Sequence, residues 1–194
     1  IFMFQAVPRV RKALSRDCFS YKQRLQKGQS MPTEGQKKLL EELKNSLTRA
    51  LPEGRITSGD YARTGCHLEV RLNDVGMRRV AVVMKGNHLY LETITAVDFP
   101  GSFELIYFYS TWHDDICRVI ARIQILKDAS PHTVSAVYPG AIWLEREIYD
   151  FFGIRFLDHP DLRRLLNPDD ADYFPLLKTF GKTKLTEEID DILC

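Results

Sequence analysis

A run of residues that is apolar on both faces of an extended chain places the tightest limit on the fold. It covers residues 103–111 and reads FELIYFYST. Such a strand has to be covered on both sides, so it belongs in the interior of a sheet. Residues 89–97 are rich in β-branched side chains. Between the two segments, Phe99-Pro100-Gly101-Ser102 places Pro and Gly at the central positions of a type II turn. We therefore expect a strand that turns directly into a central strand.

Two further segments alternate apolar and polar residues with the period of a half-buried strand. Residues 117–125 follow a turn at 113–115 and are expected to complete an antiparallel hairpin with the central strand, as an outer strand covered on one side only. Residues 66–72 show the same alternation and precede a turn at Asn73-Asp74.

The period of an amphipathic helix runs through residues 35–51, whose leucines and Ala50 fall within an arc of about 120°. Pro52 ends this helix. A second helix opens at Pro139-Gly140, and Gly153 closes it as a left-handed cap. Residues 77–84 are ambiguous, since their apolar positions fit both a strand and a helix.

The composition is that of a soluble globular chain. Of 194 residues, 44% are hydrophobic and 27% are charged, which excludes a wholly disordered, collagen-like or disulfide-stapled protein. The order of elements predicts an α+β fold, a two-layer αβ domain over residues 33–157 with a mostly antiparallel or mixed sheet. Residues 1–32 then form a basic N-terminal arm. Residues 158–194 form an extended C-terminal tail whose aromatic side chains need a surface to cover them.

The two ends of the chain carry opposite charge. Residues 1–27 contain seven basic side chains and one acid, whereas residues 167–194 contain seven acids and three lysines. An Arg-rich, acid-poor start is typical of the neighbourhood of an organellar targeting sequence. A solvated basic tail, or an arm lying on an acidic partner, explains the same composition.

Missing motifs argue against several classes of function. The chain has no run of about 20 apolar residues, so it is not expected to cross a membrane by itself. Its four cysteines form no CxxC, which argues against a zinc or iron–sulfur site and suggests a reducing compartment. Neither a GxGxxG nor a GxxxxGKS/T motif occurs, and no RNP, zinc-finger or helix-turn-helix signature points to nucleic acid.

The densest polar cluster lies in the second predicted helix and just after it. On a helical wheel the outward arc holds four residues, Trp143, Arg146, Glu147 and Asp150. Glu145 borders the apolar arc and needs water or a cation, because an unpaired buried charge costs several kcal/mol. Arg163 and Arg164 are its nearest cationic partners in the sequence.

Three interpretations of this cluster are open. A freestanding metal-dependent hydrolase would use Glu147, Asp150 and His159. Against it, Glu145 and Glu147 point about 200° apart on a helix, and only one histidine is near. A solvated charged helix face is the simplest alternative. Trp143, flanked by Arg and carboxylates on the outward arc, favours a protein–protein interface instead.

At these residues the sequence resembles the thirty-kilodalton (C-type) subunit family of respiratory NADH:ubiquinone oxidoreductase, complex I, of mitochondria and bacteria. Two segments carry the resemblance, WLEREIYDFFGI from Trp143 and HPDLRRLL from His159. The similarity extends back to about residue 64 and forward to about residue 180. The signature residues are Trp143, Glu145, Arg146, Glu147, Tyr149, Asp150, His159, Asp161, Arg163 and Arg164.

The sequence departs from the family after the arginine pair. Leu177 and Thr179 stand where the family usually has arginine and aspartate, which suggests a divergent member. The resemblance also implies that residues 77–86 form a helix.

The resemblance implies a non-redox core subunit of the hydrophilic arm of mitochondrial complex I, on the matrix side of the inner membrane. Such a subunit supports the assembly and structure of the quinone-reducing module of this proton-translocating oxidoreductase. Family members bind neither FMN nor Fe–S clusters, which lie in partner subunits. No cofactor, metal or catalytic residue is therefore expected in this chain.

The implied partners are the forty-nine-kilodalton quinone-site subunit and neighbouring Fe–S subunits. The signature residues would then form charge-assisted pairs that fix the helix against the tail and orient both on the partner. A simple adaptor outside respiration is the remaining alternative.

Overall fold

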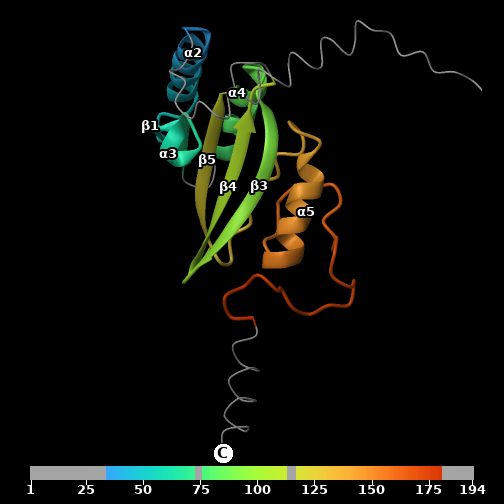
Figure 1. Cartoon of the computed structure of the whole chain (residues 1–194). Helices are drawn as coiled ribbons and strands as arrows, with labels where there is room; N and C mark the ends of the chain where they lie inside the picture. The colour runs from blue at the N-terminus through green and yellow to red at the C-terminus, as the bar shows by residue number, and fades with distance from the viewer. Residues whose placement is uncertain (1–33, 73–75, 113–116, 181–194) are drawn as a thin grey trace, which may run out of the picture. The chain divides into compact units, whose positions relative to one another are not determined.

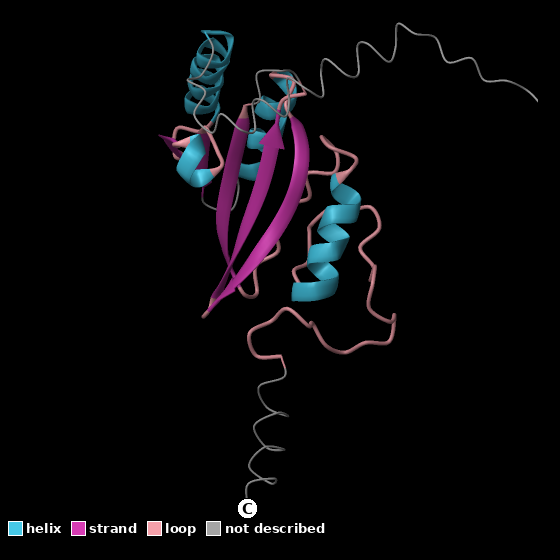
Figure 2. Cartoon of the chain, viewed as in Figure 1, coloured by secondary structure: helices cyan, strands magenta, loops and turns pink. Residues whose placement is uncertain are grey.

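The computed structural model of the chain describes residues 34–72, 76–112 and 117–180. In these ranges five strands form one mixed sheet in the order β1-β2-β5-β4-β3 (Figures 1 and 2). The strands are β1 (Arg55–Ser58), β2 (Leu68–Leu72), β3 (Tyr90–Phe99), β4 (Ser102–Ser110) and β5 (Arg118–Leu126). The helices are α2 (Glu34–Ala50), α3 (Tyr61–Thr64), α4 (Met77–Gly86) and α5 (Ala141–Phe152).

Strands β3, β4 and β5 form an antiparallel meander. β3 pairs with β4 up to the pair Phe99↔Ser102. Gly101 in the turn between them has a φ of 81°, the positive value that the second central position of a type II turn requires. β4 pairs with β5 over its whole length. The predicted turn, central strand and hairpin are therefore confirmed. The prediction that residues 117–125 form an outer strand covered on one side only is wrong, because β2 pairs with the other edge of β5 and Ile120 is buried on the second face of the sheet.

β2 joins the meander as a parallel strand. It pairs in register with residues 119–123 of β5, and β1 extends the sheet antiparallel to β2. A parallel pair needs a crossover connection, which α4, β3 and β4 supply. The sheet is thus mixed, and the predicted α+β fold is confirmed. The strand predicted over 66–72 begins at Leu68.

Helices α2, α4 and α5 pack against one face of the sheet and share one core with it. This core includes Leu43 and Leu47 of α2, Val80 and Met84 of α4, Ile148 of α5, and Leu105, Tyr107, Val119 and Ala121 of the sheet. α4 lies behind the strands in Figure 1. The helix predicted over 35–51 is confirmed as α2, and the helix that the resemblance implied over 77–86 is confirmed as α4.

The opposite face of the sheet holds a smaller apolar cluster. Cys66, Ile106 and Ile120 are buried there, with Phe108 packed beside them. Glu104 and Phe108 of β4 are half-buried on this face. The central strand is thus fully covered on one side and partly covered on the other.

Several predictions fall on residues outside the described ranges. These are the arm over 1–32 with Thr33, the turns at 73–74 and 113–115, and residues 181–194 of the tail. The described part of the tail, 158–180, contains neither helix nor strand, and the division of the chain at 32 and 157 stays a prediction. Within the described ranges, no helix combines the length and apolar character that crossing a bilayer requires.

Candidate functional site

The signature residues lie on α5 and on the chain that follows it. α5 ends at Gly153, whose φ of 76° and N–H bond to the Tyr149 carbonyl form the predicted left-handed cap. Residues 158–180 are termed the C-terminal segment. This segment continues from α5 without regular structure and is drawn in orange and red in Figure 1.

Asp150 is the centre of the contacts between α5 and the C-terminal segment. Its side chain is completely buried. Oδ2 accepts hydrogen bonds from the consecutive amides of Leu165, Leu166 and Asn167 at 2.7–3.1 Å. Oδ1 accepts from Arg164 Nη1 at 3.0 Å and from Asn167 Nδ2 at 3.1 Å. Burial acts to raise the pKa of Asp150, but these donors outweigh it and hold the pKa well below its usual range.

Arg164 extends this anchor along the segment. Besides Asp150, its guanidinium donates to the carbonyls of Ala171 and Tyr173, the latter at 3.1 Å. The same group lies 5.0 Å from the centre of the Phe174 ring. Its side chain is only 9% exposed. Arg164 therefore holds the segment in a compact loop against the end of α5.

Arg146 fixes the segment one helical turn earlier. Its Nε and Nη2 donate to the carbonyls of Arg163 and Arg164 at 3.2 and 2.8 Å. The guanidinium lies 4.9 Å from the centre of the Trp143 ring. The prediction that Arg146 and Asp150 point outward is wrong with respect to solvent, because both side chains are buried. The helical wheel correctly placed both residues on the side of α5 that faces away from the sheet, but the C-terminal segment covers that side.

Four signature residues are exposed at the edge of the contact between α5 and the C-terminal segment: Trp143, Glu147, Asp161 and Arg163. Trp143 is 59% exposed, and Glu147 is exposed. Asp161 and Arg163 form an exposed ion pair with Nε and Oδ2 3.0 Å apart. Tyr149 packs edge-on against the Phe174 ring.

Glu145 lies outside this cluster and is completely buried. Its Oε1 accepts from the Val134 amide at 2.8 Å, and its Oε2 accepts from the Thr133 hydroxyl. Burial raises the pKa of Glu145 to about 7, although the bonds from Thr133 and Val134 and the charge of Arg78 act to lower it. Glu145 thus ties α5 to the loop before it.

The predicted pairing of Glu145 with Arg163 or Arg164 is wrong. Arg163 binds Asp161, and Arg164 binds Asp150. The arginines are nearest in sequence, but the chain fold brings loop residues to Glu145 instead, and their neutral donors leave its charge only partly compensated.

His159 links the start of the C-terminal segment to the first turn of α5. Its Nε2 donates to the Ile142 carbonyl at 3.2 Å and lies 3.8 Å from Glu145 Oε2. Its Nδ1 accepts from the Asp161 amide at 3.1 Å. An acceptor at one nitrogen and a donor at the other assign the neutral Nε2–H tautomer.

The geometry does not bring Glu147, Asp150 and His159 together as a metal site. Both oxygens of Asp150 and both nitrogens of His159 already have partners in the chain, and Glu147 is exposed. Within the described ranges, no three His, Cys, Asp or Glu side chains are placed to hold a metal ion. The hydrolase interpretation is not supported.

Sequence reasoning missed Asp98, which fixes the far end of the segment. Asp98 is 6% exposed, binds the Lys127 ammonium, and accepts from the Lys178 amide at 2.8 Å. The sequence did contain a signal for Asp98. This residue follows Ile94 and Ala96 at alternate positions of β3, so it occupies a position that faces the core. An acid at such a position needs a partner.

The outer side of α5 and the following chain exposes large apolar side chains. They are between 39% and 69% exposed and comprise Trp143, Leu157, Leu166, Tyr173, Leu176 and Phe180. Arg146, Asp150 and Arg164 of the same stretch are directed inward, whereas other charged side chains, among them Asp161, Arg163, Asp169 and Asp172, are exposed beside the apolar ones. Several large exposed apolar side chains within one stretch of chain, with charged groups beside them, are typical of a surface that another protein covers.

Comparison with known sequences decides the family. Residues 70–186 match the family described as "Respiratory-chain NADH dehydrogenase, 30 Kd subunit". The matched region runs from within β2 through α5 and the C-terminal segment and covers more than half of the chain. The chain belongs to this family.

Bacterial and mitochondrial members of the family are similar to this chain. The C subunit of NADH-quinone oxidoreductase from Ruegeria pomeroyi is 39% identical over 100 residues, 50% of this chain and 50% of the relative. The C subunit from a Jannaschia species is 43% identical over 97 residues, 48% and 46% of the two chains. The mitochondrial 30.4 kDa subunit of NADH-ubiquinone oxidoreductase from Neurospora crassa is 36% identical over 129 residues, 62% and 44%. The chain spans about half the length of the curated relatives it matches.

In this member of the thirty-kilodalton subunit family, the charged motif of α5 acts within the chain. Arg146, Asp150 and Arg164 hold the C-terminal segment, while Trp143 and the apolar groups of the segment stay exposed.

Proposed function

We propose that this chain is a non-redox core subunit of the peripheral arm of mitochondrial NADH:ubiquinone oxidoreductase, where it supports the assembly and structure of the quinone-reducing module. The family match over residues 70–186 supports this proposal. The similar relatives are named as subunits of NADH-quinone or NADH-ubiquinone oxidoreductases, and one of them is mitochondrial. The Arg-rich, acid-poor composition of residues 1–27 agrees with a mitochondrial location. The matrix side of the inner membrane is part of the proposal.

The observation that carries the proposal is the two-sided build of the C-terminal segment. Its inner side is held by buried charge-assisted bonds to Asp150, so the segment presents a fixed shape. Its outer side exposes apolar groups such as Leu166 and Leu176, at 69% and 53%. A pre-shaped apolar surface docks with less loss of entropy than a free tail.

The proposed partners are the forty-nine-kilodalton quinone-site subunit and adjacent Fe–S subunits. FMN and Fe–S clusters then belong to the partners, and this chain contributes no catalytic residue, cofactor ligand or metal ligand. The signature residues Trp143, Asp161 and Arg163 lie at the rim of the docking surface in this proposal.

The experiment compares assembly of tagged chains in the cells that produce this protein. A chain with Leu166→Asp and Leu176→Asp should lose most of its co-migration with NADH dehydrogenase activity on a native gel, because charges would be buried in the interface. A matched control is Val82→Asp, which changes an equally exposed apolar residue, 58% exposed, on α4.

Two outcomes would contradict the proposal. The wild-type chain could run apart from NADH dehydrogenase activity, as an adaptor outside respiration would. The double variant could also assemble as well as the control. Far-UV circular dichroism of the isolated variants establishes that a loss of assembly is not a loss of fold.

A further inference from the structure

The face of the sheet opposite α2, α4 and α5 carries a second candidate surface, termed the outer sheet face. It is the side to which alternate residues of the strands point, among them Arg71, Arg122, Glu104, Ile106 and Val97. The helices that form the main core pack on the other side, with α4 behind the strands in Figure 1. α5 packs on the other side of the sheet, and the C-terminal segment reaches this face at Phe99, where the Lys178 ammonium lies 5.4 Å from the ring centre. The proposed function does not account for the arginines of this face.

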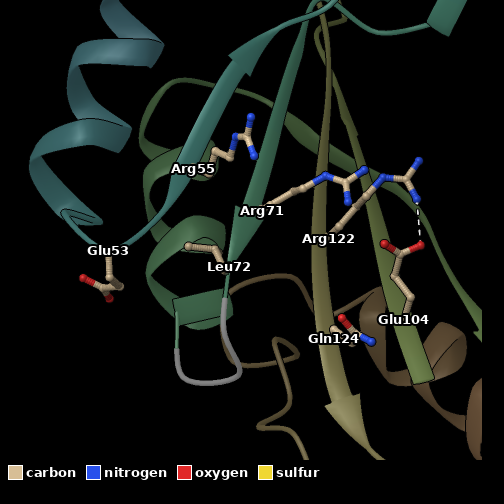
Figure 3. Close-up of a pocket in the computed structure, with 7 residues that line it drawn as sticks. All are labelled: Glu53, Arg55, Arg71, Leu72, Glu104, Arg122 and Gln124. Carbon is tan, nitrogen blue, oxygen red and sulfur yellow. Dashed lines mark hydrogen bonds and ion pairs between the residues drawn. The ribbon is translucent and has the colours of Figure 1, made fainter. Parts of the chain in front are cut away.

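Three arginines form a row across neighbouring strands on this face. Arg55 of β1 is the register partner of Arg71 of β2, which is the register partner of Arg122 of β5. Figure 3 shows their side chains next to one another, beside a hollow of about 250 Å³. Like charges on directly opposed strand positions are destabilising unless anions separate them.

Two carboxylates contact the three guanidinium groups of this row, while a third, Glu53, lines the hollow but pairs with Arg79 at 3.2 Å. Glu69 is shared, with Oε1 2.9 Å from Arg71 Nη2 and 3.0 Å from Arg122 Nε. Glu104 Oε2 lies 3.0 Å from Arg122 Nη1, the contact dashed in Figure 3. Arg55 is exposed and forms no ion pair with any residue of the described ranges. The row therefore has room for at least one additional negative charge.

Exposed apolar side chains lie on the same face, on β3 and at the end of β5, with β4 between β3 and the arginine row. Val97, Phe99 and Leu126 are 36%, 40% and 66% exposed. Where β3 begins, Trp112 is 76% exposed and stacks on Tyr90 with ring centres 4.0 Å apart. Exposed aromatic and aliphatic groups next to arginine are typical of protein-binding surfaces.

We propose that the outer sheet face docks a polypeptide segment of another protein that carries both carboxylate and apolar side chains. The carboxylates would lie along Arg55, Arg71 and Arg122, and the apolar groups over Val97 and Phe99. Charge complementarity selects this occupant. A nucleic acid fits less well, because Glu69 and Glu104 lie within the row and would repel successive phosphates.

The test places a photo-crosslinking residue on the face. Thr57 is exposed and neighbours Arg55 on β1, so Thr57→p-benzoylphenylalanine reports on whatever covers the row. The tagged full-length chain is irradiated in its native assembly, whichever assembly that is, and adducts are sequenced by mass spectrometry. The adduct can be detected whether or not the assembly contains NADH dehydrogenase. A failure of the proposed function can therefore be told apart from a failure of this inference.

The expected result is an adduct with an Asp- or Glu-containing segment of a different protein. Adding Arg55→Glu should lower the adduct yield about tenfold, because it turns the attraction of one carboxylate into repulsion. The matched control is Arg49→Glu, an exposed arginine on α2 away from the sheet, which should leave the yield unchanged.

Several results would overturn the inference. The first is the absence of any adduct in the native assembly. The second is an adduct with lipid, nucleic acid, a second copy of this chain or a segment without carboxylates. The third is an adduct yield that Arg55→Glu leaves unchanged. If Arg55→Glu lowers the amount of folded chain, Arg55→Gln removes the charge with less strain, and its yield must still fall several-fold relative to Arg49→Gln.

Discussion

Asp150 and Glu145 are two buried carboxyl groups on the same helix whose pKa values are shifted in opposite directions. Asp150 accepts from three consecutive amides and an arginine, which outweigh the cost of burial and keep it ionised. Glu145 has only two neutral donors, and its burial raises the pKa to about 7. Two differences separate the groups: Glu145 lies deeper in the chain, and Asp150 has more donors, one of which is charged.

The shift at Glu145 predicts a specific pH dependence of stability. Its pKa of about 7 in the folded chain lies above its ordinary value of 4.5. The folded state therefore binds this proton more tightly, so the stability contribution is complete below pH 4.5 and is lost as the pH rises through about 7. Between about pH 5 and about pH 8 this titration should lower the unfolding free energy of the wild-type chain by an amount on the order of 2 to 3 kcal/mol. Glu145→Gln has no proton to lose, so the variant should not show this decrease.

Urea unfolding of both chains at the two pH values measures this difference. The glutamine amide can accept from the Val134 amide and donate to Thr133 Oγ, as the protonated carboxyl would, so the fold should persist. An identical pH dependence in the two chains would show that Glu145 does not titrate in this range.

Gly153 offers a test of how tightly the C-terminal segment packs. It has a φ of 76°, and a methyl group on it would lie 2.8 Å from the Phe174 ring. Gly65 is also a left-handed helix cap, with a φ of 71°, but nothing lies within 4 Å of its added methyl group. Gly65→Ala should cost about 1–2 kcal/mol of unfolding free energy from backbone strain alone. Gly153→Ala should cost about 1–3 kcal/mol more, because Phe174 has to move. If chemical denaturation showed that the two substitutions lower the unfolding free energy equally, Phe174 would not pack against Gly153.

At the scale of elements, the contact between α5 and the C-terminal segment depends on Arg164. Arg164→Ala removes its bonds to Asp150, Ala171 and Tyr173 together. Amide hydrogen exchange over residues 165–180 should then become at least about tenfold faster, while exchange in β3–β5 stays unchanged. Arg163→Ala is the control, since its side chain is 70% exposed and forms only a surface pair. Similar exchange in the two variants would rule out this role for Arg164.

Local periodicity was sufficient to predict most elements but not how they pair. The helix over 35–51, the turn at Gly101 and the strands of the meander follow from residues that are neighbours in sequence. β1 and α3 have four residues each, too few for a period to show. The parallel pairing of β2 with β5 joins residues about fifty positions apart, and no local pattern encodes it.

The structure brings together part of the motif that the sequence singled out, while the role of its residues at an interface stays a prediction. The motif residues on α5 and after it do converge, and Trp143 is exposed as the interface interpretation requires. The burial of Arg146 and Asp150 depends on a segment without any period of its own, so a helical wheel could not foresee it. For Glu145 the relevant loop precedes the helix, and nearness in sequence favoured the wrong partners.

At the scale of the whole molecule, the αβ domain should fold without the C-terminal segment. The main core draws its buried members from residues before 157, and only Leu162 and Leu177 of the segment pack against it. A chain of residues 34–157 should therefore unfold cooperatively in urea, with lower stability than the full chain. Absence of a cooperative transition would mean that the segment is part of the folding unit.

The same truncated chain tests whether Asp150 stabilises the fold through its contacts with the C-terminal segment. In the full chain, Asp150→Asn should cost about 3–5 kcal/mol, because it leaves Arg164 without its buried charge partner. In the 34–157 chain the carboxylate faces water, and the same substitution should cost less than about 1 kcal/mol. If the two costs are equal, the stabilising contacts of Asp150 lie inside the domain and not in the segment.

The parallel pairing of β2 with β5 also sets an order on how the chain can mature. While it emerges from the ribosome, β2 has only the short β1 as a neighbour until residue 126, the last of β5, has been synthesised. Contacts of such long sequence separation form slowly. Until then the apolar face of β2 has no sheet to join, so the nascent polypeptide exposes it to holding chaperones until β5 has been synthesised.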